Sequence, residues 1–114
     1  MFRIPSYFLG GIMLERDFQA LVIKEIKNMF PECFVLKCDG SNTPQGFPDI
    51  LIINDSKWAV LEFKKSEKDR NSKNGPRPNQ EYYISRLGKM SFAKFIYPEN
   101  KEEVLDELQQ AFRS

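Results

Sequence analysis

Three residues with ionisable side chains lie where two short apolar runs of the sequence begin or end. Asp49 opens the run Asp-Ile-Leu-Ile-Ile, whereas Glu62 and Lys64 close the run Trp-Ala-Val-Leu-Glu-Phe-Lys. An unpaired charge is costly in the apolar interior that such runs build, so these groups need a partner. Two carboxylates and an ammonium group that converge can hold a divalent cation and a phosphate.

The chain contains no histidine among its 114 residues. Ser-His and Cys-His nucleophilic catalysis, histidine-metal finger nucleases and most zinc sites each need an imidazole, so these classes are excluded. A metal in this chain would be held mainly by carboxylate and carbonyl oxygens. Such ligands favour Mg²⁺ or Mn²⁺.

The two apolar runs are typical of neighbouring buried strands. Residues 54–57, Asn-Asp-Ser-Lys, predict a tight turn between them. The resulting hairpin brings Asp49 opposite Glu62, and Lys64 shares a face with Glu62 because residues two apart on a strand point the same way. Adjacent carboxylates repel each other, which raises the cost of ionising both unless a cation lies between them.

Each of these residues also has a purely structural interpretation. Pro48-Asp49 is a common turn dipeptide, so Asp49 could cap its strand. Glu62 and Lys64 could lie at an exposed strand end, as charged residues usually do. The pattern Glu-x-Lys occurs three times in the chain, and the copies at 25–27 and 99–101 are expected on solvated helix faces. Only the combination with Asp49 distinguishes the third copy.

The elements before the hairpin follow from apolar spacing and from turn-forming residues. Apolar residues at three- and four-residue spacing predict a helix over 14–30, which Pro31 ends. A strand is expected over 33–38. A loop rich in Gly, Ser, Asn and Pro over 39–46 then leads to the hairpin.

The second half of the chain completes an α/β pattern. A polar loop is expected over 65–79, and a short helix over 80–87 that stops at Gly88. A last strand over 91–97 precedes a helix from Pro98 to about residue 112, with acidic residues in its first turns. The fold class is therefore predicted as α/β, a mixed sheet flanked by helices in the order α-β-β-β-α-β-α.

The ordered motifs resemble the PD-(D/E)xK nuclease superfamily, and within it the virus-type replication-repair nuclease (VRR-NUC) domain. The resembling motifs are Gly46-Phe47-Pro48-Asp49, then Leu61-Glu62-Phe63-Lys64, then Gln80 at the start of a helix that ends Leu87-Gly88. Glu15, near the start of the first helix, matches an acidic residue of that family. The likeness covers about residues 14–108 and implies a restriction-endonuclease-like core.

The resemblance implies a metal site with four contributors. Asp49, Glu62 and the main-chain carbonyl of Phe63 would bind Mg²⁺ or Mn²⁺, and Glu15 would reach the metal directly or through water. The position of Glu15 also has a purely structural explanation, because a helix dipole favours an acidic residue in the first turn.

The resemblance implies two further catalytic residues. Lys64 would orient or help deprotonate the attacking water, and Gln80 would steady Lys64 or a phosphate. Gln80 also follows Asn79, an ordinary helix cap, so a structural role explains it equally well.

The predicted loop 65–79 carries basic residues beside the proposed site, and these would give salt-dependent, sequence-independent contacts to DNA phosphates. The residues are Lys65, Lys68, Arg70, Lys73 and Arg77. An ordinary solvated loop is the alternative. The formal net charge of +1 gives no global sign of nucleic-acid binding. Most aromatic residues fit core faces, so no base-stacking surface is expected.

Residues 1–13 are apolar but interrupted by Arg3, Pro5, Gly10 and Gly11. The stretch is too short to cross a bilayer and lacks the cleavage site of a signal peptide. We therefore expect a cytoplasmic protein, bacterial or phage-encoded and then in the host cytoplasm. Residues 1–13 are a candidate dimer arm, and residues 14–114 form a single nuclease domain.

The function that the resemblance implies is a metal-dependent DNA endonuclease that hydrolyses phosphodiester bonds. A homodimer acting on branched DNA, such as a Holliday junction, would match a two-fold symmetric substrate in replication, recombination or repair. One alternative is an exonuclease or an RNA-directed nuclease with the same chemistry. Another is a non-catalytic nucleic-acid-binding or assembly module that keeps the fold.

Overall fold

The computed structural model describes residues 14–40, 42–72 and 77–114, so the candidate dimer arm and Lys73 lie outside the described residues. The helices are α2 (Glu15–Met29), α3 (Glu67–Asn71), α4 (Pro78–Met90) and α5 (Lys101–Arg113), with a 3₁₀ turn η1 (Pro98–Asn100) before α5. The strands are β1 (Phe34–Lys37), β2 (Ile50–Asn54), β3 (Lys57–Phe63) and β4 (Phe92–Ile96).

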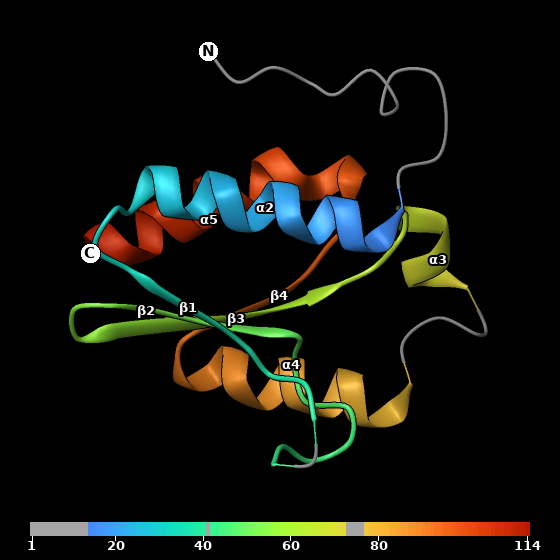
Figure 1. Ribbon diagram of the computed structural model, residues 1–114. Coiled ribbons are helices and arrows are strands. Elements are labelled where there is room, and N and C mark those ends of the chain that lie inside the picture. The colour runs from blue at the N-terminus through green and yellow to red at the C-terminus, as the bar shows by residue number, and fades with distance from the viewer. Residues whose placement is uncertain (1–13, 41, 73–76) are drawn as a thin grey trace.

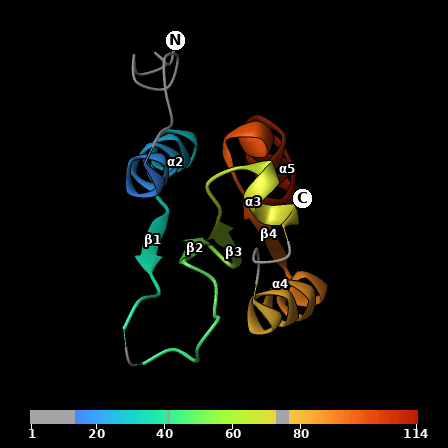
Figure 2. The same cartoon turned by 90° about the vertical axis from the view of Figure 1, so that its right-hand side faces the viewer.

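The described strands form one mixed sheet between two helical layers. Figure 1 shows α2 and α5 on one face and α4 on the other. The strand order is β1-β2-β3-β4, antiparallel up to β3 and parallel between β3 and β4. In the turned view, α4 lies under the β3–β4 half of the sheet (Figure 2). The predicted fold class and the order α-β-β-β-α-β-α are confirmed, with α3 and η1 added as short elements.

The β2–β3 hairpin has the predicted register. Ile53 pairs with Trp58 and Ile50 with Leu61, so the next position along the ladder sets Asp49 against Glu62. The turn residue Asp55 has a φ of 57°, a left-handed conformation that aspartate tolerates better than most residues. The hairpin therefore carries both carboxylates to the same end of the sheet.

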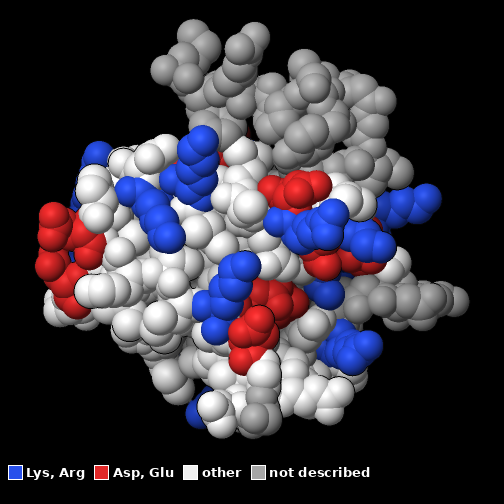
Figure 3. Space-filling view, in the orientation of Figure 1, with Lys and Arg blue, Asp and Glu red and all other residues white. Residues whose placement is uncertain are grey.

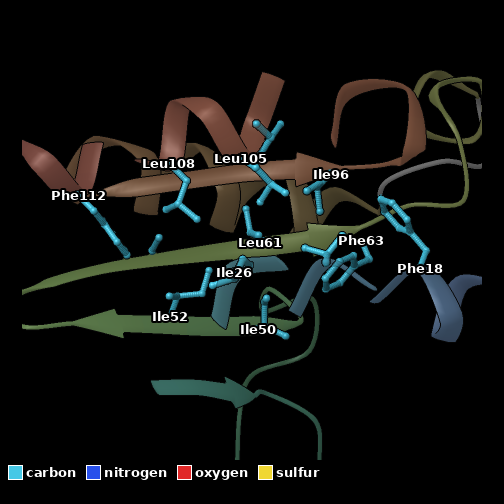
Figure 4. Packing of buried hydrophobic residues seen from close by; sticks show 13 residues of the cluster. Phe18, Ile26, Ile50, Ile52, Leu61, Phe63, Ile96, Leu105, Leu108 and Phe112 are labelled. Atoms are coloured by element: carbon cyan, nitrogen blue, oxygen red, sulfur yellow. The ribbon is translucent and has the colours of Figure 1, made fainter. Parts of the chain in front are cut away.

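The core lies between the sheet and the α2–α5 layer. Figure 4 shows side chains of β2, β3 and β4 pointing toward these two helices. Phe18 of α2 meets Phe63 of β3 edge to face at 5.9 Å between ring centroids. Both rings are buried, which fixes the start of α2 against the end of β3. That contact determines where Glu15 lies relative to the hairpin.

The prediction of an uninterrupted loop over 65–79 is wrong. Ser66 caps α3 by accepting a hydrogen bond on its Oγ from the amide of Asp69 at 3.1 Å, a local pairing that apolar periodicity does not reveal. Helix α4 begins at Pro78 rather than Gln80, because proline is favoured in the first turn of a helix.

Gly88 does not end its helix as predicted, since α4 continues to Met90. A Cβ added at Gly88 would lie 3.9 Å from the Cβ of Ala93, an ordinary van der Waals contact, so the packing of α4 on β4 does not require a glycine here. The prediction failed because Gly88 does not adopt the positive φ of a glycine that ends a helix, and an isolated glycine within a helix is tolerated.

The expectation that the copies of Glu-x-Lys at 25–27 and 99–101 lie on solvated helix faces is wrong for Lys101. Lys101 is 8% exposed, and its Nζ lies 2.7 Å from Oε2 of Glu25 and 2.6 Å from Oε1 of Glu102. These hydrogen bonds raise the pKa of Lys101 against the opposing effect of burial. Glu25 and Lys101 therefore join α2 to α5 rather than facing solvent.

Candidate active site

A pocket of about 350 Å³ opens at the end of β3 and holds most of the predicted site residues. Its walls come from the first turns of α2, the residue before β2, the end of β3 and the start of α4. The lining residues are Glu15, Gln19, Asp49, Glu62, Phe63, Lys64, Arg77 and Gln80. The structure thus gathers every residue to which the resemblance gives a metal or catalytic role.

Asp49 is fixed by the backbone of the neighbouring strand. Its Oδ2 accepts a hydrogen bond from the amide of Phe63 at 2.8 Å. The carboxylate therefore replaces a main-chain acceptor at the end of the β2–β3 ladder. The same carboxylate is also hydrogen-bonded by the side chain of Glu62, which contributes to the raised pKa of Glu62.

Gln80 connects the acidic and basic groups of the pocket. Its Nε2 donates to Oε2 of Glu62 at 3.2 Å, and its Oε1 accepts from Nζ of Lys64 at 2.9 Å. The same Oε1 also accepts from the amide of Arg77 at 3.1 Å, the residue that caps α4. This reach back to the cap is half of a capping box, so helix capping itself orients the Gln80 side chain between Glu62 and Lys64.

The pKa values of two carboxyl groups of the pocket, those of Glu62 and Glu15, are raised above the values of free glutamate. Burial and then the nearby Asp49 together raise the pKa of Glu62 from 4.5 to about 8, against the opposing effect of Lys64. Burial and Asp49 also raise the pKa of Glu15. Negative charge is therefore crowded in this pocket, which is the condition that a bound cation relieves.

The stability of the metal-free protein should fall as Glu62 ionises. The pKa of Glu62 is higher in the folded state than in the unfolded one, so the unfolding free energy decreases between about pH 4.5 and pH 8. One group contributes a slope of at most about 1.4 kcal/mol per pH unit. Urea denaturation of the wild type and of Glu62→Gln, at several pH values in EDTA, measures this slope.

Glu62→Gln should flatten the slope, whereas Glu103→Gln, an exposed position on α5, should leave it as in the wild type. Equal slopes in the wild type and in Glu62→Gln would show that Glu62 titrates in the same range folded and unfolded.

The oxygen donors of the pocket suit a hard divalent cation in kind, although they do not form a complete ligand cage. Among the described residues, no group of three or more His, Cys, Asp and Glu side chains is arranged to hold a metal. The main-chain carbonyl of Phe63 adds an oxygen donor. Continued register sets Pro48 opposite Phe63, and proline has no N–H to occupy that carbonyl. Asp49, Glu62 and this carbonyl therefore fit Mg²⁺ or Mn²⁺.

The loop before β2 is held against the start of α4 by Gly46. Its φ is +88°, and a Cβ at this position would lie 2.5 Å from the Cβ of Asn79 and 3.2 Å from the amide nitrogen of Gln80. Nδ2 of Asn79 donates to the carbonyl of Gln45 at 3.3 Å across the same contact. The absence of a side chain at Gly46 thus lets this loop approach the helix start that carries Gln80.

Gly46→Ala should destabilise the fold more than Gly40→Ala. Both glycines have positive φ, but a Cβ at Gly40 meets no described atom within 4 Å. The matched pair therefore separates backbone strain from the clash with Asn79. We expect a difference of about 1–3 kcal/mol in unfolding free energy, the usual cost of overpacking, measured by urea denaturation. Equal losses would mean that the loop can move away from α4 without cost.

The basic residues predicted to bind DNA have different surroundings. Lys65 and Lys68 are exposed and form no ion pair with a described residue. Arg70 instead pairs with Glu81 at 3.0 Å, and its guanidinium lies 4.1 Å from the ring centroid of Phe95. Arg70 therefore ties α3 to α4 and β4, and phosphate binding by the loop stays a prediction that rests on its other residues.

On the face shown in Figure 3, side chains of one charge do not gather in a single patch. Acidic and basic side chains lie next to each other on that face.

Gln19 also lines the pocket, and the sequence prediction missed it. Its position four residues after Glu15, one helical turn along α2, is the signal that would have found it.

Comparison with known protein families, curated proteins and solved structures found no match to this chain. None of the helices within the described residues has the length and apolar character needed to span a membrane.

Proposed function

We propose that this protein is a divalent-metal-dependent nuclease that hydrolyses phosphodiester bonds in DNA. The observation that carries the proposal is the hydrogen-bonded set in one pocket: Gln80 bonds both Glu62 and Lys64, and Asp49 lies beside them. Two carboxylates and a main-chain carbonyl supply oxygen ligands for a cation, and an ammonium group beside them suits cation-assisted attack on a phosphodiester.

Each residue of the set has a defined task in this reaction. A bound Mg²⁺ or Mn²⁺ would act as a Lewis acid toward the phosphoryl oxygens. Asp49, Glu62 and the carbonyl of Phe63 would hold it. Lys64 would donate a hydrogen bond to the attacking water or to a phosphate oxygen. Gln80 would keep the ammonium group of Lys64 near the carboxylates without a direct ion pair, which leaves its charge available.

We further propose branched DNA as the substrate and a homodimer as the active form. The support is the resemblance to the virus-type replication-repair nuclease domain, together with the fit between a two-fold symmetric protein and a two-fold symmetric junction. A domain of this size also gains stability from pairing.

The test is a cleavage assay on a matched set of labelled substrates with Mg²⁺, Mn²⁺, Ca²⁺ or EDTA. The substrates are linear duplex, nicked, forked, four-way and single-stranded DNA, with a single-stranded RNA of the same sequence. We expect cleavage with Mg²⁺ or Mn²⁺, fastest on branched DNA, and none in EDTA. Binding of DNA without cleavage in the presence of any of these metals would favour a non-catalytic module. Cleavage of the RNA alone would show that the protein is an RNA-directed nuclease.

A further inference from the structure

The solvent side of α4 carries an aromatic row that begins at the loop before β2. Phe47 meets the half-buried Tyr83 with ring centroids 5.4 Å apart and planes at 64°. Tyr83 meets Tyr82 at 5.4 Å and 75°. Tyr82 is the outermost of the three and is 57% exposed. These edge-to-face contacts hold the Tyr82 ring in place while leaving much of it open to solvent.

Positive charge flanks the aromatic row along α4. Arg86 and Lys89 in the second half of the helix are exposed, and neither forms an ion pair with a described residue. Arg86 follows Tyr82 by four residues, so the two share a helix face. The one acidic side chain of α4, Glu81, is already paired with Arg70.

The dimensions suit a polynucleotide strand. Lys89 lies seven positions after Tyr82, which is about 10 Å along the helix, or the length of about three nucleotides of a stacked strand. An open aromatic ring beside cations is the usual composition of a surface that binds unpaired nucleotides. The exposed cations favour this polyanionic occupant over an apolar protein partner, which would leave Arg86 and Lys89 buried without partners.

We propose that the outer side of α4 binds unpaired nucleotides of the DNA substrate, with a nucleobase stacked on Tyr82 and the adjoining phosphates held by Arg86 and Lys89. This inference rests on the proposed function, because α4 also brings Arg77 and Gln80 to the catalytic pocket. A strand lying along α4 would lead to the pocket, so substrates with unpaired nucleotides beside the cut should bind best. The expectation from sequence that no base-stacking surface exists treated the aromatic residues as core, whereas Tyr82 is outside it.

The test compares Tyr82→Ala with Tyr82→Phe in the binding of a fluorescein-labelled 12-residue oligothymidylate, followed by fluorescence anisotropy in EDTA. Loss of one stacked base should weaken binding about ten-fold in Tyr82→Ala. Tyr82→Phe keeps the ring and should bind as the wild type does. Met90→Ala, an equally exposed position on the same helix at 62%, is the matched control and should change nothing.

An abasic oligomer of equal length isolates stacking from phosphate contacts, because it should bind the wild type and Tyr82→Ala equally. Equal binding of oligothymidylate by the wild type and Tyr82→Ala would overturn the inference, as would no binding at all. The result is independent of catalysis. If Tyr82→Ala weakens binding but the wild type cuts no substrate, only the nuclease proposal is refuted. If the wild type cuts DNA but Tyr82→Ala binds oligothymidylate as tightly as the wild type does, only the binding role of Tyr82 is refuted.

Discussion

Asp49→Asn should reduce the rate of DNA cleavage by about 1,000-fold, as should Glu62→Gln. The asparagine can still accept the hydrogen bond from the amide of Phe63, so the end of the hairpin should keep its shape. The charge that holds the cation is lost in each variant, and with it the stabilisation of negative charge on the phosphoryl oxygens. Single-turnover cleavage at saturating protein and Mg²⁺ measures the rate without product release.

The same variants should keep their affinity for DNA when measured in Ca²⁺, since the groups that contact phosphate and base are unchanged. Isothermal titration with Mn²⁺ should show weaker metal binding by both. Asp106→Asn, an exposed carboxylate on α5, is the control and should cleave at the wild-type rate. Cleavage by Asp49→Asn and Glu62→Gln within a few-fold of the wild type would rule out this pocket as the metal site.

The hairpin could be predicted from sequence because one periodicity and one turn determine it. Apolar residues on both faces of β3 require a central strand, and the turn at 54–57 leaves only one register that sets Asp49 against Glu62. The long-range order of the sheet followed from the alternation of helix and strand patterns. These features depend on many residues at once, so a local error does not change them.

The details that failed depend on the conformation or the contacts of single residues. Whether Gly88 ends a helix depends on the φ that it adopts, and glycine accepts a helical φ as readily as a positive one. Arg70 was counted with the other basic residues of its loop, but the nearby Glu81 and Phe95 bind it within the protein. Charge type can be read from the sequence, whereas the partner of a charge depends on the packing of distant elements.

The link between Gln80 and Lys64 was expected from the resemblance, and the structure adds its physical cause. Gln80 is the third residue of α4, and the capping contact to the amide of Arg77 turns its side chain toward β3. Gly46 then decides how closely the preceding loop approaches that helix start. The position of the Lys64 side chain therefore depends on the capping contact of Gln80 and on the missing side chain at Gly46, neither of which involves a charged side chain.

Lys64→Ala should lower the cleavage rate by about 100-fold while changing metal binding little, because general acid–base or orienting groups contribute about this much. The ammonium group has two opposing effects on the cation. It repels the cation directly, but it also lowers the pKa of Glu62 and so favours the ionised ligand. Removing Lys64 removes both effects, so the Mn²⁺ concentration that gives half-maximal activity should shift little.

The matched control is Lys65→Ala, the adjacent exposed lysine, which should keep the wild-type cleavage rate at saturating DNA. Raising the Mn²⁺ concentration separates the two explanations for any loss in Lys64→Ala. A rate that recovers fully at high Mn²⁺ would show that Lys64 only supports metal binding. A rate that stays low at every Mn²⁺ concentration requires the ammonium group during the reaction itself, and its hydrogen bond to Gln80 then fixes where that charge acts.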